Sequence, residues 1–453
     1  MKAICVLMLL LLAMSVMAAD LDELRAALVN RVDEGKKAVG IVVGTIDANG
    51  RHLTAYGKIA RNSDRTPDGD TMFEIGSMTK VFTSLVLADM IERGEVNAGD
   101  PVAKYLPVDA KLPSRNGKQI TLLDLSMQIS GLPRVPTNLD PADPANPYAD
   151  YTPARLLDFL SHYGLTRDIG EKYEYSNLGV GLLGFALARR AGISYEEMVR
   201  RRVLEPLGMT DTTITLSAGQ KKRMAAGHNA GLEPSPLWDF DALAGCGALR
   251  STANDMLKFL AANMGLVDTP LNAAMARLRS VRHDTGIADL RIMMAWHQWQ
   301  KYGAEIVWHD GGTFGFRSWM GFNPATKTGA VVLCNTAFDV QDVGLHAVDS
   351  HWPMAKFGPP KEPVEIVISA EAAERVSGGY QFAPGVVLKV THEGPRVFVQ
   401  LTGQPKFEVF AESDTEFFLK VVEAQLTFLK DGSQNVTAVV LHQNGIDQRA
   451  ARM

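Results

Sequence analysis

A serine and a lysine stand three residues apart in the stretch FEIGSMTKVFTSL, as Ser77 and Lys80. The residues that follow them are almost all apolar, which predicts a buried helix that begins near the serine. Residues three positions apart share one face of a helix, so the Lys80 amine is expected beside the Ser77 hydroxyl. A hydroxyl next to a group that can take its proton is an activated nucleophile, and this pair therefore predicts acyl transfer through Ser77.

An SxxK pair alone is weak evidence, because two common residues at a fixed spacing recur by chance. On its own it is better interpreted as a helix cap followed by a solvated lysine. Two more short motifs follow it in the chain. Tyr175 and Asn177 begin another apolar helix in EKYEYSNLGVGLLG, and residues 309–311, His-Asp-Gly, lie on a predicted strand in IVWHDGGTFGF. Each motif also fits a plain turn, cap or strand, but the ordered set favours one catalytic site.

These motifs, with the surrounding sequences ISGLP and LEPLGM, resemble the penicillin-recognising serine hydrolases. That superfamily includes class C β-lactamases, D,D-peptidases, D-aminopeptidases and related esterases. The similarity covers approximately residues 22–357. It implies an α+β fold, in which helices and a helical subdomain flank an antiparallel sheet. It also implies that no cofactor is needed, and that the substrate is a β-lactam or a peptide or ester of a D-amino acid.

The resemblance implies a role for each residue. Ser77 would attack a carbonyl and form an acyl-enzyme, while Lys80 and Tyr175 would manage its proton. The backbone N–H groups of Ser77 and Gly312 would form the oxyanion hole. The residues that would bind the substrate are Asn177, His309 and Gly311.

The third motif departs from the Lys-Thr-Gly of many relatives. A literal KTG occurs at Lys327, but NPATKTGAV is typical of a turn between strands, so this lysine is expected at an exposed hairpin tip, as is the HEG at His392. A histidine is cationic only part of the time near neutral pH. Asp310, where threonine is usual, adds a charge that repels a carboxylate, which disfavours efficient β-lactam hydrolysis but not slow acylation. Arg317 is either a compensating cation or an exposed strand residue.

The 453 residues are 46% hydrophobic and 21% charged, which suffices for one large or two ordinary domains. A formal net charge of -5 supplies no basic field, so nucleic acid is not an expected partner. No HExxH motif is present, and no metal is expected. Beyond the first residues, Cys246 and Cys334 are the only cysteines. Both lie in apolar sequence and are interpreted as buried thiols, with a disulfide between them left open.

The N-terminus predicts export. Residues 1–19 contain one lysine, then an apolar run, then small residues, which is the pattern of a cleavable signal peptide. The run is short for a membrane span, so we expect a periplasmic or secreted protein without a stable membrane anchor.

Three further segments are predicted. Residues 20–356 should form the β-lactamase-like domain, from a hairpin at 39–60 through helices to strands near residues 305–334. Residues 357–364, FGPPKEPV, predict a linker. Residues 365–453 contain short, evenly spaced strands that predict a small all-β barrel, similar to the lipocalin-like domains attached to some of these hydrolases. We expect a shielding or assembly role for it, and the sequence leaves the subunit number open.

Three functions remain open. The preferred one is an exported acyl-serine hydrolase, similar to class C β-lactamases, that acts on β-lactams or D-alanyl amides. The second is an esterase or D-aminopeptidase on the same scaffold. The third is a penicillin-binding sensor that is acylated without turnover. The motifs do not separate the three.

Overall fold

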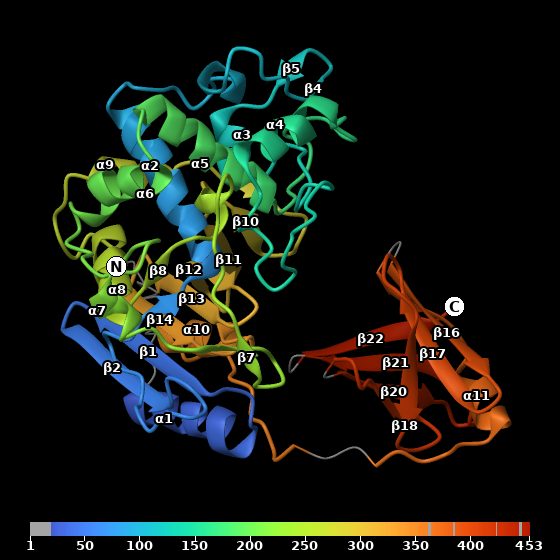
Figure 1. The fold of residues 1–453 in the computed structure, drawn as a ribbon. Helices are drawn as coiled ribbons and strands as arrows, with labels where there is room; N and C mark the ends of the chain where they lie inside the picture. Colours follow the sequence, from blue (N-terminus) through green and yellow to red (C-terminus); the bar gives the residue numbers. More distant parts are fainter. Residues whose placement is uncertain (1–19, 361–363, 384–385, 423, 444–445) are drawn as a thin grey trace, which may run out of the picture. The chain divides into compact units, whose positions relative to one another are not determined.

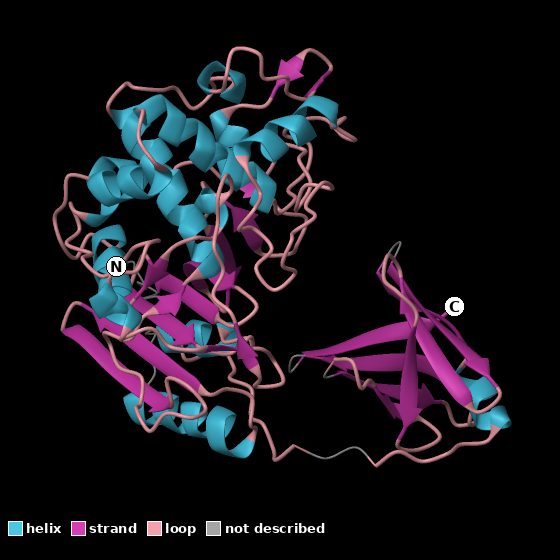
Figure 2. Ribbon diagram, viewed as in Figure 1, coloured by secondary structure: helices cyan, strands magenta, loops and turns pink. Residues whose placement is uncertain are grey.

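The computed structural model describes residues 20–360, 364–383, 386–422, 424–443 and 446–453. The predicted signal peptide, residues 1–19, and residues 361–363 of the predicted linker lie outside the described residues. The chain divides into two compact units: one runs up to Lys356 apart from Glu34–Lys36, and the other contains Glu34–Lys36 and Phe357–Met453. Figures 1 and 2 show the helices and strands of each unit.

The first unit is built on an antiparallel sheet in the order β2-β1-β14-β13-β12-β11-β10-β9. Its strands are β1 (Gly40–Asp47), β2 (Gly50–Gly57), β9 (His283–Asp284), β10 (Leu290–Ile292), β11 (His297–Lys301), β12 (Ala304–Gly312), β13 (Arg317–Asn323) and β14 (Thr328–Cys334). The pairing of β1 with β14, for example Ile41 with Cys334, joins the beginning and the end of the unit in one sheet. In Figure 1 the blue β1 and β2 accordingly lie beside the orange β13 and β14.

Alternating side chains of the central strands enter two different cores. On β1, Ile41 and Val43 pack in a cluster with α10 (Gln341–Val348), whereas Val42 joins the larger cluster that contains α8 (Ala253–Asn263). Helix α1 (Leu21–Val29) supplies Leu24 and Leu28 to the same cluster as α10. The sheet is therefore covered by helices on both faces, as the α+β prediction requires.

Most remaining helices belong to the middle of the sequence. They are α2 (Thr79–Glu92), α3 (Leu122–Ser126), α4 (Pro153–His162), α5 (Asn177–Ala191), α6 (Tyr195–Val199), α7 (Ala218–Lys221) and α9 (Asn272–Leu278). Short two-stranded sheets pair β3 (Phe73–Glu74) with β8 (Arg250–Ser251), β4 (Ser114–Arg115) with β5 (Lys118–Gln119), and β6 (Gly227–His228) with β7 (Pro234–Ser235). Helix α2 is buried along nearly its whole length, and Phe82 stacks on Phe259 of α8 with ring centroids 4.3 Å apart.

The second unit is a closed eight-stranded antiparallel barrel. Its strands are β15 (Gly378–Ala383), β16 (Val386–Glu393), β17 (Arg396–Leu401), β18 (Phe407–Ala411), β19 (Glu416–Phe418), β20 (Ala424–Lys430), β21 (Val436–Gln443) and β22 (Ile446–Arg452), and α11 (Ala370–Val376) precedes them. Alternate residues such as Leu388 and Val390 are buried, and Phe417 meets Phe428 edge to face. The barrel carries a hydrophobic core of its own side chains, and the predicted all-β barrel is confirmed.

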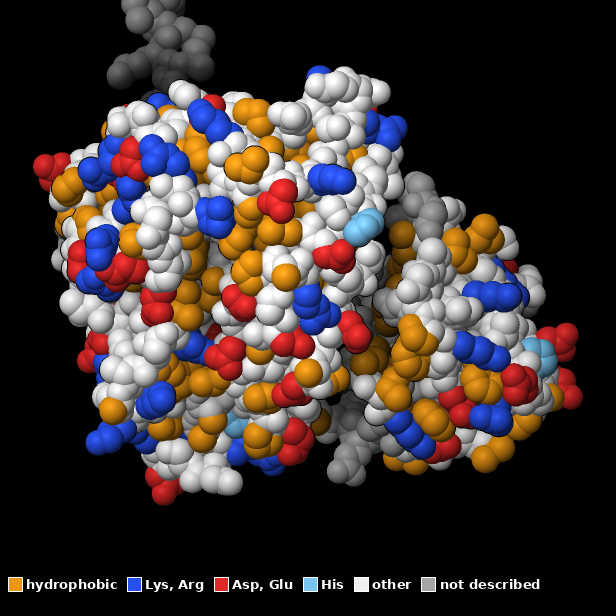
Figure 3. Space-filling model, turned by 45° about the horizontal axis from the view of Figure 1, so that its top comes forward, with side chains coloured by type: hydrophobic (Ala, Val, Ile, Leu, Met, Phe, Trp, Pro, Cys, Tyr) orange, Lys and Arg blue, Asp and Glu red, His pale blue; other side chains and the backbone are white. Residues whose placement is uncertain are grey.

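Surface features of the described residues agree with the compositional analysis. Acidic and basic side chains are interspersed over the face drawn in Figure 3. None of the helices that the structure describes is long and apolar enough to cross a membrane. Cys246 and Cys334 are both buried and free, which answers the question of a bridge between them.

Candidate active site

Ser77 lies in a 3-10 turn, Gly76–Met78, that leads directly into α2. This turn meets the end of β12 at very short range. A Cβ atom on Gly76, whose φ is +49°, would lie 2.6 Å from the backbone nitrogen of Gly312, and one on Gly311 would lie 2.0 Å from the carbonyl oxygen of Ile75. Only glycine at these two positions allows the approach. The close contact places the Ser77 turn against the strand end where an oxyanion hole was expected.

Lys80 is fully buried one turn after the serine. Its Nζ donates to Ser77 Oγ at 2.9 Å, to Asn177 Oδ1 at 2.8 Å and to the carbonyl oxygen of Cys246 at 2.7 Å. Burial lowers the pKa of Lys80 from its usual 10.5 to about 8. A buried lysine with this pKa is partly neutral near pH 7 to 8, and a neutral amine is a base.

Tyr175 is the second predicted proton carrier, and two cations lie near its ring. Lys80 Nζ is 4.8 Å from the ring centroid and the Arg134 guanidinium carbon is 5.0 Å from it. Burial nevertheless raises the pKa of Tyr175 well above 10, with a further increase from the Asp310 carboxylate. A side-chain hydrogen bond with Ser77 acts in the opposite direction. Tyr175 is therefore a neutral phenol at pH 7, suited to relay or donate a proton.

Asn177 begins α5, which Ser176 caps by accepting a hydrogen bond from the backbone N–H of Gly179 at 2.8 Å. The carboxamide of Asn177 is held at both ends. The oxygen accepts from Lys80, and Nδ2 donates to the phenol oxygen of Tyr148 at 3.0 Å. The amide is thus fixed between the amine and a second tyrosine.

His309 lies close to the site but not on the cavity surface. Its ring is fully buried and its centroid is 6.2 Å from that of Tyr175 and 5.2 Å from that of His297. Burial lowers the pKa of His309 to about 3, with a further decrease from the Lys80 charge. From the sequence, this histidine is expected to be a part-time cation for a substrate carboxylate. That expectation is corrected: His309 is neutral at pH 7, because the sheet and its aromatic neighbours exclude water.

A cavity of about 590 Å³ opens onto Ser77, Tyr175 and Asn177. Its lining includes Ser77, Arg134, Val135, Tyr148, Tyr173, Tyr175, Asn177, Trp238, His297, Asp310, Gly311, Gly312, Thr313, Phe314 and Arg317. Trp238 meets Phe314 edge to face with centroids 4.7 Å apart, and Tyr148 edge to face at 5.4 Å. The serine therefore faces a cavity with an aromatic wall and with charged groups of both signs.

Of the residues chosen from sequence, the structure brings five into this lining: Ser77, Tyr175, Asn177, Gly311 and Gly312. Lys80 and His309 lie beneath the surface. Lys327, of the literal KTG, is exposed between β13 and β14 at a φ of +56°, as expected of a hairpin tip. His392 lies near the end of β16, before the turn into β17.

Sequence reasoning missed several residues of the cavity. Arg134 directly follows the ISGLP motif and Tyr148 lies in a proline-rich segment, and neither was chosen from the sequence. His297 belongs to a short strand that was not predicted, and its Nε2 is 3.0 Å from the hydroxyl of Tyr173. The charge of Arg134, directly after the ISGLP motif, was the one feature of the sequence that could have pointed to these cavity residues.

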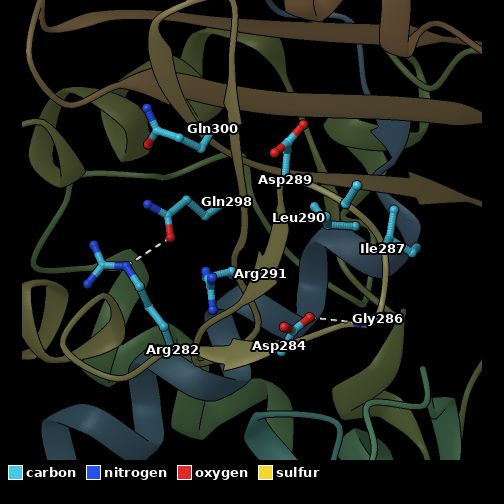
Figure 4. A pocket seen from close by; sticks show the side chains of 10 residues that line it. Arg282, Asp284, Gly286, Ile287, Asp289, Leu290, Arg291, Gln298 and Gln300 are labelled. Atoms are coloured by element: carbon cyan, nitrogen blue, oxygen red, sulfur yellow. Dashed lines mark hydrogen bonds between the residues drawn. The ribbon is translucent and has the colours of Figure 1, made fainter.

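A second cavity, of about 620 Å³, lies around β9 to β11. Figure 4 shows its lining, in which Arg282 Nε donates to Gln298 Oε1 at 2.8 Å and Asp284 lies near Arg291. Residues from α2, α5 and the Gly311 segment are absent from this lining. Its charges are mixed and none of its described residues is a nucleophile, so the cavity at Ser77 is the candidate active site.

Comparisons with known proteins agree with this geometry. A family model named Beta-lactamase matches residues 25–349. The D-alanyl-D-alanine-carboxypeptidase/endopeptidase AmpH of Escherichia coli (strain K12) is 33% identical over 228 residues, 50% of this chain and 57% of that protein. This chain therefore spans just over half the length of that relative. Penicillin-binding protein 4* of Bacillus subtilis (strain 168) is 23% identical over 437 residues, 88% of this chain and 91% of that protein.

A solved structure shows the same fold. The class C beta lactamase from Rhodobacter sphaeroides has a TM-score of 0.63 and 23% sequence identity, covering 73% of this chain and 99% of that one. The region that the family model matches begins within α1 and ends at the residue after α10. It therefore includes the whole sheet and every group around Ser77. Because this match covers well over half of the sequence, the chain belongs to the Beta-lactamase family.

Proposed function

We propose that the protein is an active-site serine hydrolase of the class C β-lactamase and D-alanyl-D-alanine carboxypeptidase type, which forms an acyl-enzyme on Ser77. One observation carries the proposal: the three hydrogen bonds of Lys80 to Ser77, Asn177 and Cys246. A protonated lysine uses all of its N–H groups in these bonds. A neutral lysine keeps two of them, and its lone pair then points at the Ser77 hydroxyl as a base.

The reaction follows from these positions. Ser77 Oγ attacks the substrate carbonyl carbon while its proton passes to Lys80, and the backbone N–H groups of Ser77 and Gly312 stabilise the oxyanion. The bond to the leaving nitrogen or oxygen then breaks, and the neutral phenol of Tyr175 relays the Lys80 proton to it. Water attacks the acyl-enzyme by the reverse path, with Tyr175 and Lys80 accepting its proton.

The substrates that we propose are β-lactams and D-alanyl amides, because the similar proteins include a class C beta lactamase and a D-alanyl-D-alanine-carboxypeptidase/endopeptidase. The neutral His309 and the acidic Asp310 in place of a Lys-Thr pair favour the amide and ester substrates over rapid β-lactam turnover. We also propose that the protein is exported, because the predicted signal peptide precedes the first described helix. N-terminal sequencing of the secreted or periplasmic protein tests this, and the mature chain should begin near residue 20.

The decisive experiment is mass spectrometry of the intact protein after incubation with benzylpenicillin, together with rates on nitrocefin, D-alanyl-p-nitroanilide and p-nitrophenyl butyrate. We expect an adduct on Ser77 that disappears with time, and no adduct or turnover in Ser77→Ala. Relative rates on the three substrates separate a β-lactamase, a D-aminopeptidase and an esterase. A permanent adduct without turnover would indicate a sensor, and equal activity of Ser77→Ala would refute the proposal.

A further inference from the structure

Asp310 places a carboxylate in the cavity that contains Ser77. Its side chain is 54% exposed, and its carboxylate lies 3.9 Å from Nδ1 of His309. Because His309 is neutral at pH 7, this contact is not an ion pair. In the part of the chain that the structure describes, no group donates a hydrogen bond to the Asp310 carboxylate.

The position of Asp310 on β12 puts this charge beside the reacting atoms. Strand β11 pairs with β12 only as far as Trp308, opposite His297, so on that side no described strand pairs with the residues after Trp308. Asp310 stands two residues before Gly312, a separation of about 7 Å along an extended strand. A substrate whose carbonyl is bound between Ser77 and Gly312 therefore places its nearest substituents within reach of the carboxylate.

No described ion pair joins Asp310 to Arg134 or Arg317, although the Asp310 charge attracts that of the buried Lys80 and raises the Lys80 pKa. Arg317 Nη1 donates to the carbonyl oxygens of Thr313 at 2.7 Å and Phe316 at 3.0 Å, which ties this guanidinium to its own loop. Arg134 is exposed and lies against the Tyr175 ring. The cavity thus offers an anion on β12 and a cation on the loop before α4, which suits a substrate with a positive group as well as a negative one.

We propose that Asp310 is a specificity-determining residue that selects substrates carrying an ammonium group next to the scissile carbonyl. The class of substrate is an amide or ester of an amino acid or amino-substituted amine, with the free ammonium on the acyl side or on the leaving-group side. A carboxylate at that place is disfavoured. The inference rests on the proposed function, because it requires that Ser77 is the nucleophile.

The test compares substrates that differ by one charge. On the acyl side the pair is D-alanyl-p-nitroanilide and its N-acetyl derivative; on the leaving-group side it is the 2-aminoethylamide and the propylamide of N-acetyl-D-alanine. Ampicillin and benzylpenicillin, which differ by an ammonium, give a third pair read as the rate of Ser77 acylation. The wild type should prefer the ammonium member of at least one pair, and Asp310→Asn should lower that preference about tenfold.

Two variants make the result specific. Asp109→Asn removes the same charge from an exposed residue outside the cavity lining and should keep the wild-type preference. Arg134→Gln should slow N-acetyl-D-alanyl-D-alanine, which carries a carboxylate, without lowering the ammonium preference. Ratios that are identical in the wild type and Asp310→Asn, with Ser77 still acylated, would overturn this inference alone. If Ser77 reacts with none of these compounds, the proposed function fails instead.

Discussion

Tyr148 fixes the orientation of the Asn177 carboxamide: its phenol oxygen accepts a 3.0 Å hydrogen bond from Asn177 Nδ2. With the nitrogen bound there, the amide oxygen faces Lys80 at 2.8 Å. Stacking on Phe240, with ring centroids 4.9 Å apart, holds the Tyr148 ring in turn. A loop residue that is absent from the three sequence motifs thus positions a residue within one of them.

Removal of that hydroxyl is expected to loosen the amide. We predict that Tyr148→Phe lowers kcat/KM about fivefold, because a net hydrogen bond of about 1 kcal/mol is lost. Tyr163→Phe is the matched control, since Tyr163 stacks on Phe159 away from the cavity lining and should leave kcat/KM unchanged. Equal kinetics for the two variants would show that Tyr148 does not act through Asn177.

The lowered pKa of Lys80 predicts how the rate of acylation depends on pH. If the neutral amine is the base, kcat/KM rises about tenfold per pH unit below the pKa of about 8 and reaches a plateau above it. The Lys80→Arg variant should lose the activity and should show no increase of kcat/KM with pH, since a guanidinium stays protonated. Stopped-flow acylation rates between pH 6 and pH 9 measure this; a profile that is flat across the range would exclude Lys80 as the base.

The contact between Gly311 and the carbonyl of Ile75 predicts a steric effect. In Gly311→Ala the new Cβ would lie 2.0 Å from that oxygen, so β12 and the Ser77 turn must separate. We expect kcat/KM to fall about 100-fold and the free energy of unfolding to decrease by about 1–3 kcal/mol. Gly219→Ala, where no atom lies within 4 Å of the added Cβ, should change neither. A fully active Gly311→Ala protein would contradict the close approach.

The raised pKa of the buried Glu74 predicts that the free energy of unfolding depends on pH. Glu74 is 4% exposed, and its Oε1 accepts from the backbone N–H of Trp238 at 2.7 Å. Burial raises the pKa of Glu74 from 4.5 to about 7, an increase that the Arg250 charge partly offsets. Between pH 4.5 and 7 the folded protein keeps this proton while the unfolded chain loses it, so the contribution of Glu74 to stability falls as pH rises.

Glu74→Gln should remove this dependence. The free energy of unfolding of the wild type minus that of the variant should decrease by about 3 kcal/mol from pH 4.5 to pH 7. The variant therefore gains stability relative to the wild type as the pH rises. Urea denaturation at several pH values measures the difference. A difference that stays constant over this interval would mean that the carboxyl titrates at its ordinary pKa.

Much of this architecture was predictable because strong local patterns encode it. The hairpin of β1 and β2 follows from alternating residues around Asp47 and Gly50, and the buried helix α2 from its continuous apolar run. The Beta-lactamase family and the C-terminal barrel were likewise predicted correctly. Strands β9 to β11 were missed, since they are short and contain polar residues such as Gln298 and Gln300 that resemble loop.

The candidate site was predictable only where its residues lie in motifs. Ser77, Lys80 and Asn177 meet because helical spacing and a capped helix fix them locally. Arg134 and Trp238 come from loops whose positions depend on tertiary packing, which no local pattern encodes. The protonation state of His309 also depends on burial by distant strands. The roles of these residues in catalysis stay predictions until the variants are measured.

The pairing of β1 with β14 also constrains how the protein is made. A ribosome adding roughly 5–20 residues per second needs on the order of 15–60 seconds to proceed from β1 to β14. During that time the β1 edge of the nascent β1–β2 hairpin has no partner strand, and apolar residues such as Val42 and Val43 lie on it. Aggregation during synthesis should therefore begin at this edge, and a chaperone that binds extended apolar segments would find its first target there.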